Sequence, residues 1–410
     1  MDYDPYGWTP SDKFVCWRCV QDDNYLIARL KGEGSDGNHC SYCSQPGATS
    51  LDTLLALVDA AVGSRWQDAN EAPGVYSSRD GGYQFPTEDL WDVQENLLGD
   101  YIENGNLIQD ILESFGSRIM AEIWDGDDEG RGDPWHSFST FVMHRARYMF
   151  WTDSETLSND ENRWYGSSPI GALEDLGRRI HAHDMLRTLD VDAKFWRAQG
   201  HQGPELDGGP TSARLGTVPV EYAFAPNRMS APGIPMFYGS LDKETAVAEA
   251  TRHGDPRWDH ATVAAFRPSR PLTVLDLGAV TVPPEPSIFM DLSDPSVEEY
   301  YDARFLEGFV ESVRRPVAEK ADHRGIEYVP TQVFTEFALH ALGRMTEPQT
   351  HIDGILYPSA EVEDAANLVL DVVNRHCVSA PTKYATESGQ LELVLDADSI
   401  AVAKRDWQVE

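Results

Sequence analysis

Residues 227–239 have the sequence NRMSAPGIPMFYG, and residues 240–252 continue as SLDKETAVAEATR. The apolar run at residues 234–238 predicts a β-strand. Asp242 is placed to cap a helix over residues 245–252, because aspartate side chains accept hydrogen bonds from the free amides of a first helical turn. The strand and helix predict that this part of the chain mixes both kinds of element.

The rest of the C-terminal half continues this mixture. Alternating or apolar runs predict two longer helices, at 297–315 and 331–342, and strands at 193–197, 262–266, 272–277, 354–357, 367–372, 391–395 and 400–403. This α+β order with many short strands is compatible with a sandwich or split barrel that clasps a cleft.

Four of the five cysteines form two pairs, Cys16-Trp-Arg-Cys19 and Cys40-Ser-Tyr-Cys43. Two Cys-x2-Cys knuckles predict a four-thiolate zinc site. Disulfides are the alternative, but they are rare in the reducing compartment expected for a chain without a secretion signal. Four sulfurs would fill a tetrahedral site and leave no position for a substrate, so the metal is expected to be structural.

Helical spacing dominates between the cysteines and the C-terminal half. Helices are predicted at 51–62 after a Ser50 cap, at 88–98 after a Thr87 cap, at 107–115, at 138–150 and at 168–186. We therefore predict three segments, namely a zinc ribbon at 1–48, a helical N-terminal region at 49–185, and a C-terminal α+β domain at 186–410.

Length and charge narrow the function. The 410 residues exceed the ~250–300 at which one hydrophobic core usually stops growing. The chain has 68 acidic and 33 basic residues and a net charge of −35, which argues against coating nucleic acid or anionic membrane. No apolar run approaches the ~20 residues that span a bilayer, and the N-terminus lacks a signal core, so we expect a soluble cytoplasmic protein.

Five blocks of the C-terminal half occur in the same order as those of the RES domain, a family named for an Arg, a Glu and a Ser, and resemble them. The blocks are Phe195–Ala198, Asn227–Gly239, Glu244–Glu249, Tyr328–Gln332, and Asp353–Ser359 with Asn367-Leu-Val. The N-terminal half is similar to the zinc-chelating module that precedes RES or HEPN domains in bacterial conflict proteins, and the cysteine knuckles carry that similarity.

The RES resemblance implies a mixed α/β sandwich related to ADP-ribosyltransferases and the activity of toxins that deplete NAD. The reaction would break the nicotinamide–ribose bond, as a glycohydrolase or a phosphorylase. Transfer of ADP-ribose to a macromolecule is the alternative. The setting implied is that of toxin–antitoxin and phage-defence systems, with NAD as substrate and an inhibitory antitoxin or an activating trigger as partner. The sequence names neither partner and leaves the oligomeric state open.

Three residues are expected to bind or act on NAD most directly. Arg197 and Arg228 match the family's arginines, and a guanidinium offers the planar, bidentate donors that suit a pyrophosphate. Glu249 matches the family's glutamate and would stabilise the positive charge that grows on the ribose as the bond breaks. A solvated surface role is the alternative for each, and Glu244 is expected to face outward.

Three further residues are expected to line the site. Tyr238 is expected to be catalytic together with Arg197 and Glu249, because its ring would stack on nicotinamide and its hydroxyl would reach a polar partner; the alternative is a half-buried strand tyrosine. Ser359 would donate a hydrogen bond to the ligand, or it is an ordinary turn serine; no neighbouring base marks it as a nucleophile. Gln332 is a weaker lining candidate that could equally belong to the scaffold.

Two features stand outside this scheme. Arg131 and His136 have the Arg-x4-His spacing of HEPN ribonucleases, although Gly132 and Pro134 interrupt a continuous helix there. An RNA-cleaving or RNA-binding protein is therefore the remaining alternative function. The segment at 204–225 is longer than a short RES linker, and its role is open.

Overall fold

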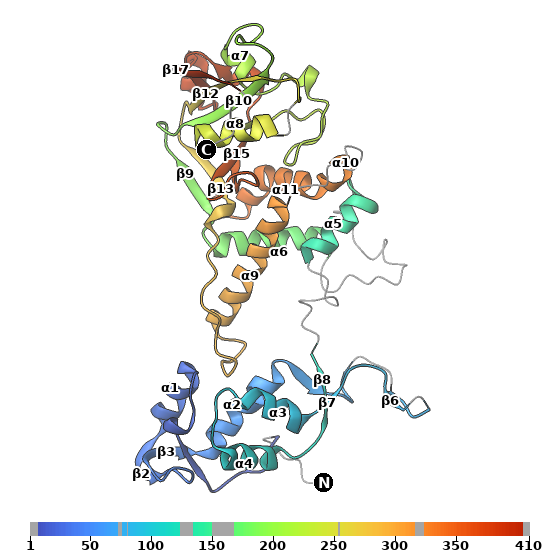
Figure 1. Cartoon of the computed structure of the whole chain (residues 1–410), viewed down its shortest axis with the longest axis vertical. Coiled ribbons are helices and arrows are strands. Elements are labelled where there is room, and N and C mark those ends of the chain that lie inside the picture. The colour runs from blue at the N-terminus through green and yellow to red at the C-terminus, as the bar shows by residue number, and fades with distance from the viewer. Residues whose placement is uncertain are drawn as a thin grey trace. The chain divides into compact units, whose positions relative to one another are not determined.

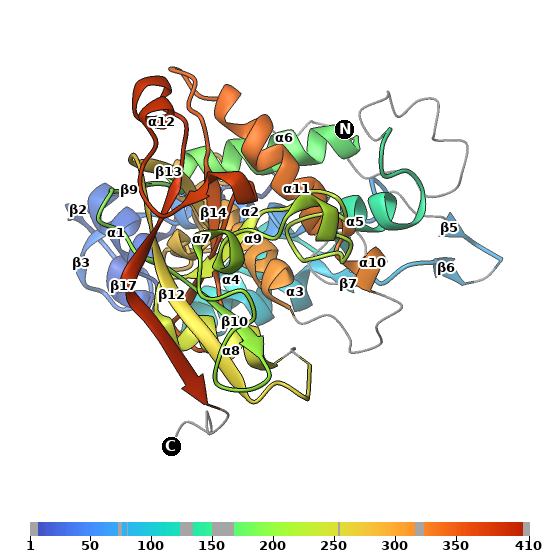
Figure 2. The same cartoon turned by 90° about the horizontal axis from the view of Figure 1, so that it is seen from above.

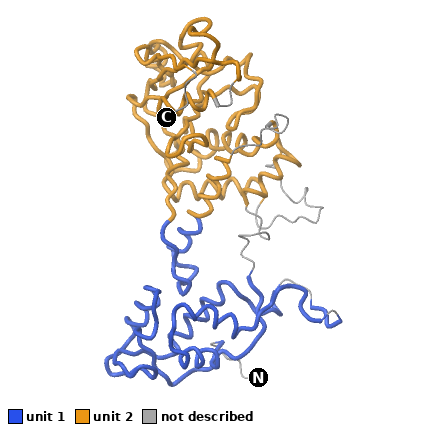
Figure 3. The backbone as a smooth tube through the Cα atoms, viewed as in Figure 1, with its two compact units in different colours: residues 1–132, 283–302 blue, residues 133–282, 303–410 orange. Residues whose placement is uncertain are grey.

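The computed structural model describes residues 7–72, 76–79, 81–123, 134–149, 168–252, 255–315 and 324–404. The chain divides into two compact units, 1–132 with 283–302 and 133–282 with 303–410 (Figure 3). Each unit is thus built from separate stretches of sequence, and the division at residues 48 and 185 remains our proposal for the domain boundaries. In the described part of the chain, no helix has both the length and the apolar character needed to cross a membrane.

The first unit contains short strands and amphipathic helices (Figure 1). Its helices are α1 (Asn24–Glu33), α2 (Leu51–Gly63), α3 (Leu90–Leu98) and α4 (Gly105–Phe115), and the first residues of α9 (Pro295–Arg314) also belong to it. Its strands are β1 (Phe14–Cys16), β2 (Ser35–His39), β3 (Pro46–Ser50), β4 (Trp66–Asp68), β5 (Tyr76–Ser77), β6 (Gly82–Tyr83), β7 (Glu88–Asp89) and β8 (Ile119–Glu122).

Side-chain caps set where these helices begin. Ser50 accepts a hydrogen bond from the Asp52 backbone amide at 3.2 Å, which confirms the predicted start of α2. The predicted Thr87 cap is wrong. The cap of α3 is Asp89, which accepts from the Trp91 amide at 2.9 Å, because the chain is still extended at Glu88 and Asp89, where β7 pairs with β8.

The helices of the first unit bury their apolar faces in one core. The segment at 283–302 completes this core, because Phe289 is almost fully buried in it and meets the Tyr101 ring edge-on, with 5.2 Å between ring centroids. Residues far apart in sequence therefore share one hydrophobic interior.

The second unit is built on one nine-stranded sheet with the order β16-β17-β12-β10-β11-β15-β14-β13-β9. Its strands are β9 (Leu186–Leu189), β10 (Phe195–His201), β11 (Phe237–Ser240), β12 (His260–Pro268), β13 (Leu272–Asp276), β14 (Gly354–Pro358), β15 (Ala366–Leu370), β16 (Cys377–Val378) and β17 (Leu393–Lys404). Its helices are α5 (Pro134–His144), α6 (Pro169–Ala182), α7 (Ser212–Leu215), α8 (Lys243–Arg252), α10 (Arg324–Glu327), α11 (Val329–His340) and α12 (Lys383–Ser388), with the rest of α9.

The two faces of this sheet are buried in different cores. Alternation along β15 sends Leu368 and Leu370 to one core and Val369 to the other. The Val369 core is filled by α5, α6, α9 and α11. Leu189 of β9 and Cys377 of β16, at opposite ends of the strand order, both join the Leu368 core, so the sheet closes over its own apolar face as a sandwich does.

Two sequence predictions need correction here. The predicted strands at 391–395 and 400–403 form one long strand, β17, which pairs with β12 through a register shift between Val263 and Ala265 (Figure 2). The helix predicted at 168–186 starts after the Ser168 cap but ends at Ala182, because Leu186 pairs with Leu275 of β13. A bulge and an edge strand are tertiary features that local periodicity does not reveal.

Candidate functional site

The four paired cysteines lie together in the first unit, with their sulfur atoms all within 4.8 Å of one another. Cys16 Sγ is 3.4 Å from Cys43 Sγ and 4.0 Å from Cys19 Sγ, and Cys19 Sγ is 3.6 Å from Cys40 Sγ. A tetrahedron with Zn–S bonds of ~2.3 Å puts its sulfurs ~3.8 Å apart. These spacings fit one zinc ion and are too long for disulfide bonds.

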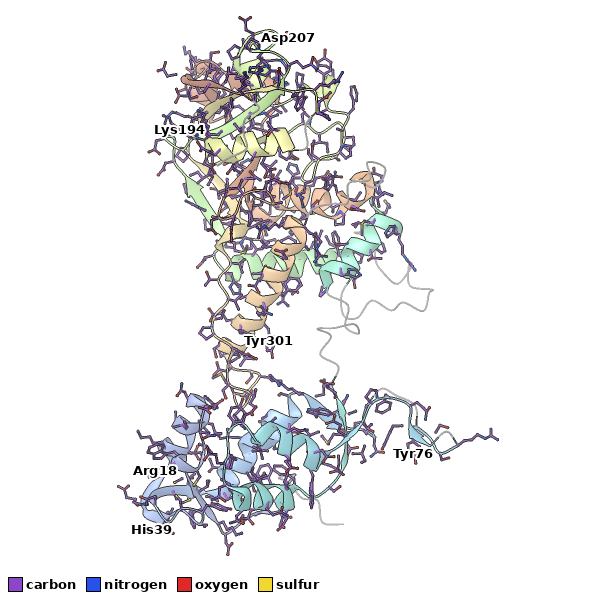
Figure 4. All side chains as sticks on the ribbon, in the orientation of Figure 1. Arg18, His39, Tyr76, Lys194, Asp207 and Tyr301 are labelled. Carbon is purple, nitrogen blue, oxygen red and sulfur yellow. The ribbon has the colours of Figure 1, made fainter. Side chains whose placement is uncertain are left out.

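Backbone hydrogen bonds around the cysteine cluster favour the thiolate form of Cys40. Burial opposes charge on Cys40, but backbone amides outweigh it and lower the pKa of that thiol to about 7. Arg18 and His39, beside the knuckles, point outward from this unit (Figure 4). Cys16 and Cys40 are buried, Cys19 is half-buried and Cys43 is exposed. Four thiols at this spacing can fill every position of a tetrahedral site, which is the arrangement of a structural zinc.

A cavity of about 260 Å³ in the second unit gathers three of the predicted residues, Arg197, Tyr238 and Glu249. It lies where α8 packs on β10, β11, β12 and β15. Its lining also includes Trp196, Ala198, Asn227, Gly239, Ser240, Ala246, Ala250, Tyr357 and Asn367.

Glu249 is hydrogen-bonded through one of its two carboxylate oxygens. Its Oε1 accepts hydrogen bonds from Ser359 Oγ at 2.7 Å and from Asn367 Nδ2 at 2.6 Å. Its Oε2 has no hydrogen-bond partner among the described residues. Glu244 is exposed and does not line the cavity, so the structure agrees with the expected outward orientation of that side chain.

Ser359 has a different partner from the one expected. Its hydroxyl oxygen accepts from the amides of Glu361 at 3.1 Å and Val362 at 3.2 Å, which leaves its proton to point at Glu249. The side chain is 1% exposed. Ser359 therefore orients the carboxylate in this structure, and direct donation to a ligand remains a prediction.

Arg197 is a half-buried cation without a carboxylate partner. Its Nη1 donates to the Tyr238 carbonyl at 2.6 Å, and its guanidinium lies 5.6 Å from the centre of the Phe237 ring. Burial lowers the pKa of this guanidinium from its ordinary value. None of the described residues forms an ion pair with Arg197, so an anionic ligand would relieve an unpaired charge.

Tyr238 is a neutral donor in the cavity. Its hydroxyl donates to Ser230 Oγ at 2.9 Å. Burial raises the pKa of Tyr238 to about 12, against the lowering effect of Ser230 and of the Arg197 charge. The phenol therefore stays protonated at neutral pH.

Arg228 and Gln332 do not line the cavity. Arg228 Nη1 donates to the carbonyls of Val313 and Arg315, at the C-terminal end of α9, where a helix dipole attracts a cation. Gln332 Nε2 donates to the carbonyls of Asn227 at 2.8 Å and Ser230 at 3.2 Å. Both side chains support the loop beside the cavity, and their contact with a ligand stays a prediction.

Sequence reasoning missed several residues of the cavity. Asn367 and Tyr357 come from neighbouring strands, and the register pairs Tyr357 with Asn367 and Asn367 with Ser240. A polar residue at the start of an apolar strand was the available signal for Asn367. Of the HEPN-like pair, Arg131 lies outside the described residues, and His136 is exposed on α5.

Comparison with known proteins gives two family matches. Residues 33–156 match the HEPN/RES N-terminal domain 1, and residues 194–396 match the RES domain. No curated protein matches the chain. The second match contains every residue of the cavity, from Trp196 to Asn367.

Proposed function

We propose, from the premise that this chain belongs to the RES-domain family, that its cavity binds NAD and breaks the bond between nicotinamide and ribose. The observation that carries the proposal is that one cationic and one anionic side chain line the same cavity, each without an ion-pair partner among the described residues. The two side chains are Arg197 and Glu249. A ligand that is anionic at one point and becomes cationic at another would satisfy both.

NAD has this distribution of charge. Its pyrophosphate is anionic and suits the unpaired Arg197 guanidinium. Cleavage of the glycosidic bond builds positive charge on the ribose, which suits the free oxygen of Glu249. A volume of about 260 Å³ lies just below the ~300–1,000 Å³ of typical small-ligand sites, so the cavity would enclose the nicotinamide ribose rather than the whole dinucleotide.

Among the described residues, Glu249 is the one carboxylate that lines the cavity, whereas glycosidases use two. The second carboxyl of a glycosidase protonates the departing oxygen. Nicotinamide needs no such acid, because its ring nitrogen is already cationic in NAD and takes the bonding electron pair to leave as a neutral base. Water or phosphate would then attack the ribose carbon, and Glu249 could accept the proton that water loses.

The four-cysteine cluster has no part in this reaction. We propose that Cys16, Cys19, Cys40 and Cys43 hold a structural zinc ion, which supports the first unit.

The reaction can be tested with NAD labelled in its adenosine moiety. Purified full-length protein, with and without inorganic phosphate, should release nicotinamide and leave the label on free ADP-ribose or on its phosphate ester. Label attached to protein or nucleic acid would favour the transferase instead. Intact NAD under all conditions would overturn the proposal.

The same proposal predicts an order of events in cells. On unrestrained expression, cellular NAD should fall before protein or RNA synthesis fails. RNA cleavage with NAD still intact would instead support the ribonuclease alternative.

A further inference from the structure

A chain of hydrogen bonds leads from the sheet to the carboxylate of Glu249. Ser240 Oγ donates to Asn367 Oδ1 at 2.7 Å, and Asn367 Nδ2 donates to Glu249 Oε1 at 2.6 Å. Ser240 is 3% exposed and Asn367 is 5% exposed. The antiparallel register of β11 and β15 places these two residues directly opposite each other.

The chemistry of the three side chains determines which group donates and which accepts in each of these hydrogen bonds. An ionised carboxylate only accepts hydrogen bonds, so the Asn367 amide must turn its NH₂ group toward Glu249. The Ser240 hydroxyl stabilises that orientation, because it donates to the amide oxygen. A reversed amide would put its oxygen against the carboxylate, with no proton between them.

We propose that Asn367 is a positioning residue whose amide, oriented by Ser240, fixes Glu249 so that Oε2 faces the substrate. Asn367 and Ser359 both bind Oε1, one from β15 and one from the turn after β14, and this leaves the second oxygen for the ribose. What Glu249 does there rests on the proposed function. The contact between the two residues does not.

The first test is a double-mutant cycle on NAD cleavage. Loss of a hydrogen bond to a charged group should lower kcat of Asn367→Ala about tenfold to a hundredfold, with KM little changed. Ser240→Ala, which removes one hydroxyl, should also lower kcat, but by a smaller factor than Asn367→Ala does. In a Glu249→Gln background, Asn367→Ala should lower kcat by less than about twofold. An equal loss in both backgrounds, or a raised KM with normal kcat, would show that Asn367 acts independently of Glu249.

The second test needs no NAD. Asn367→Asp would bring a second carboxylate against Glu249, and two such groups share a proton, which raises the pKa of one of them. The Tm of this variant should therefore fall as pH rises from about 5 to 8. Adding Glu249→Gln should remove most of that fall.

Asn374 provides the matched control, because its Nδ2 donates to the Ala213 carbonyl at 2.8 Å and to the Thr217 carbonyl. Glu249→Gln should not change the pH dependence of Tm in Asn374→Asp. Failure of Glu249→Gln to rescue Asn367→Asp, or equal rescue of both variants, would overturn the proposed contact. Rescue in a protein that leaves NAD intact would contradict the proposed reaction and not the contact.

Discussion

Replacing Glu249 by glutamine separates binding from catalysis in this cavity. The amide oxygen of glutamine can accept the same two hydrogen bonds, from Ser359 at 2.7 Å and Asn367 at 2.6 Å, that Oε1 accepts in the native protein. The opposite orientation would set an NH₂ group against two donors. Glu249→Gln should therefore fold normally and present a neutral NH₂ group where the native protein presents Oε2.

The substitution should raise the free energy of the transition state and leave the binding of NAD nearly unchanged. Loss of one well-placed electrostatic group commonly lowers turnover by ~10²–10³, which corresponds to ~2.7–4 kcal/mol. NAD binding, followed by titration calorimetry, should change little, and steady-state release of nicotinamide should show lower kcat with nearly the same KM.

Glu244→Gln is the matched control, since Glu244 is exposed on the same helix and does not line the cavity. It should be almost silent. Full activity in Glu249→Gln would refute the carboxylate mechanism. Loss of activity in Glu244→Gln alone would mean that the wrong glutamate has been matched to the family.

Three other predictions test the remaining parts of the site. Gently purified protein should contain about one zinc ion per chain, and a chelator or Cys40→Ser should unfold the ribbon; metal-free folded protein would contradict this. Arg197→Ala should weaken NAD binding about tenfold or more in a titration, and Arg228→Ala should weaken it by less, because the Arg228 guanidinium is bound to carbonyls at the end of α9 outside the cavity; unchanged affinity in Arg197→Ala would place the pyrophosphate elsewhere. Because the pKa of Tyr238 is raised to about 12, its contribution to stability should be intact below pH ~10 and lost as pH rises toward 12; Tyr238→Phe should flatten this part of the Tm–pH curve, and an unchanged curve would refute it.

Local sequence patterns predicted those features that depend on local interactions. Ser50 and Ser168 cap their helices as predicted, because a cap requires only a side chain and the next turn of backbone. The cysteine cluster follows from two short knuckles of fixed spacing. The start of α3 could not be found in this way, since it depends on the pairing of β7 with β8.

The site was predictable in composition more than in geometry. Arg197, Tyr238 and Glu249 share a cavity as expected, whereas the partners of Ser359 and Arg228 depend on contacts across more than 80 positions of sequence. The proposed role of Asn367 could not be predicted from the sequence either, because cross-strand register brings this residue to Ser240 and the packing of α8 on the sheet brings it to Glu249.

The position of Phe289 in the first unit has a consequence for synthesis of the protein. Domains usually fold in order as the chain leaves the ribosome. Here the N-terminal unit needs residues 283–302 to close its core around Tyr101, so it can finish folding only after a large part of the second unit has also been made. A fragment that stops at residue 132 would lack this segment and leave apolar core surface open to water, and nascent chains would pass through the same exposed state during translation.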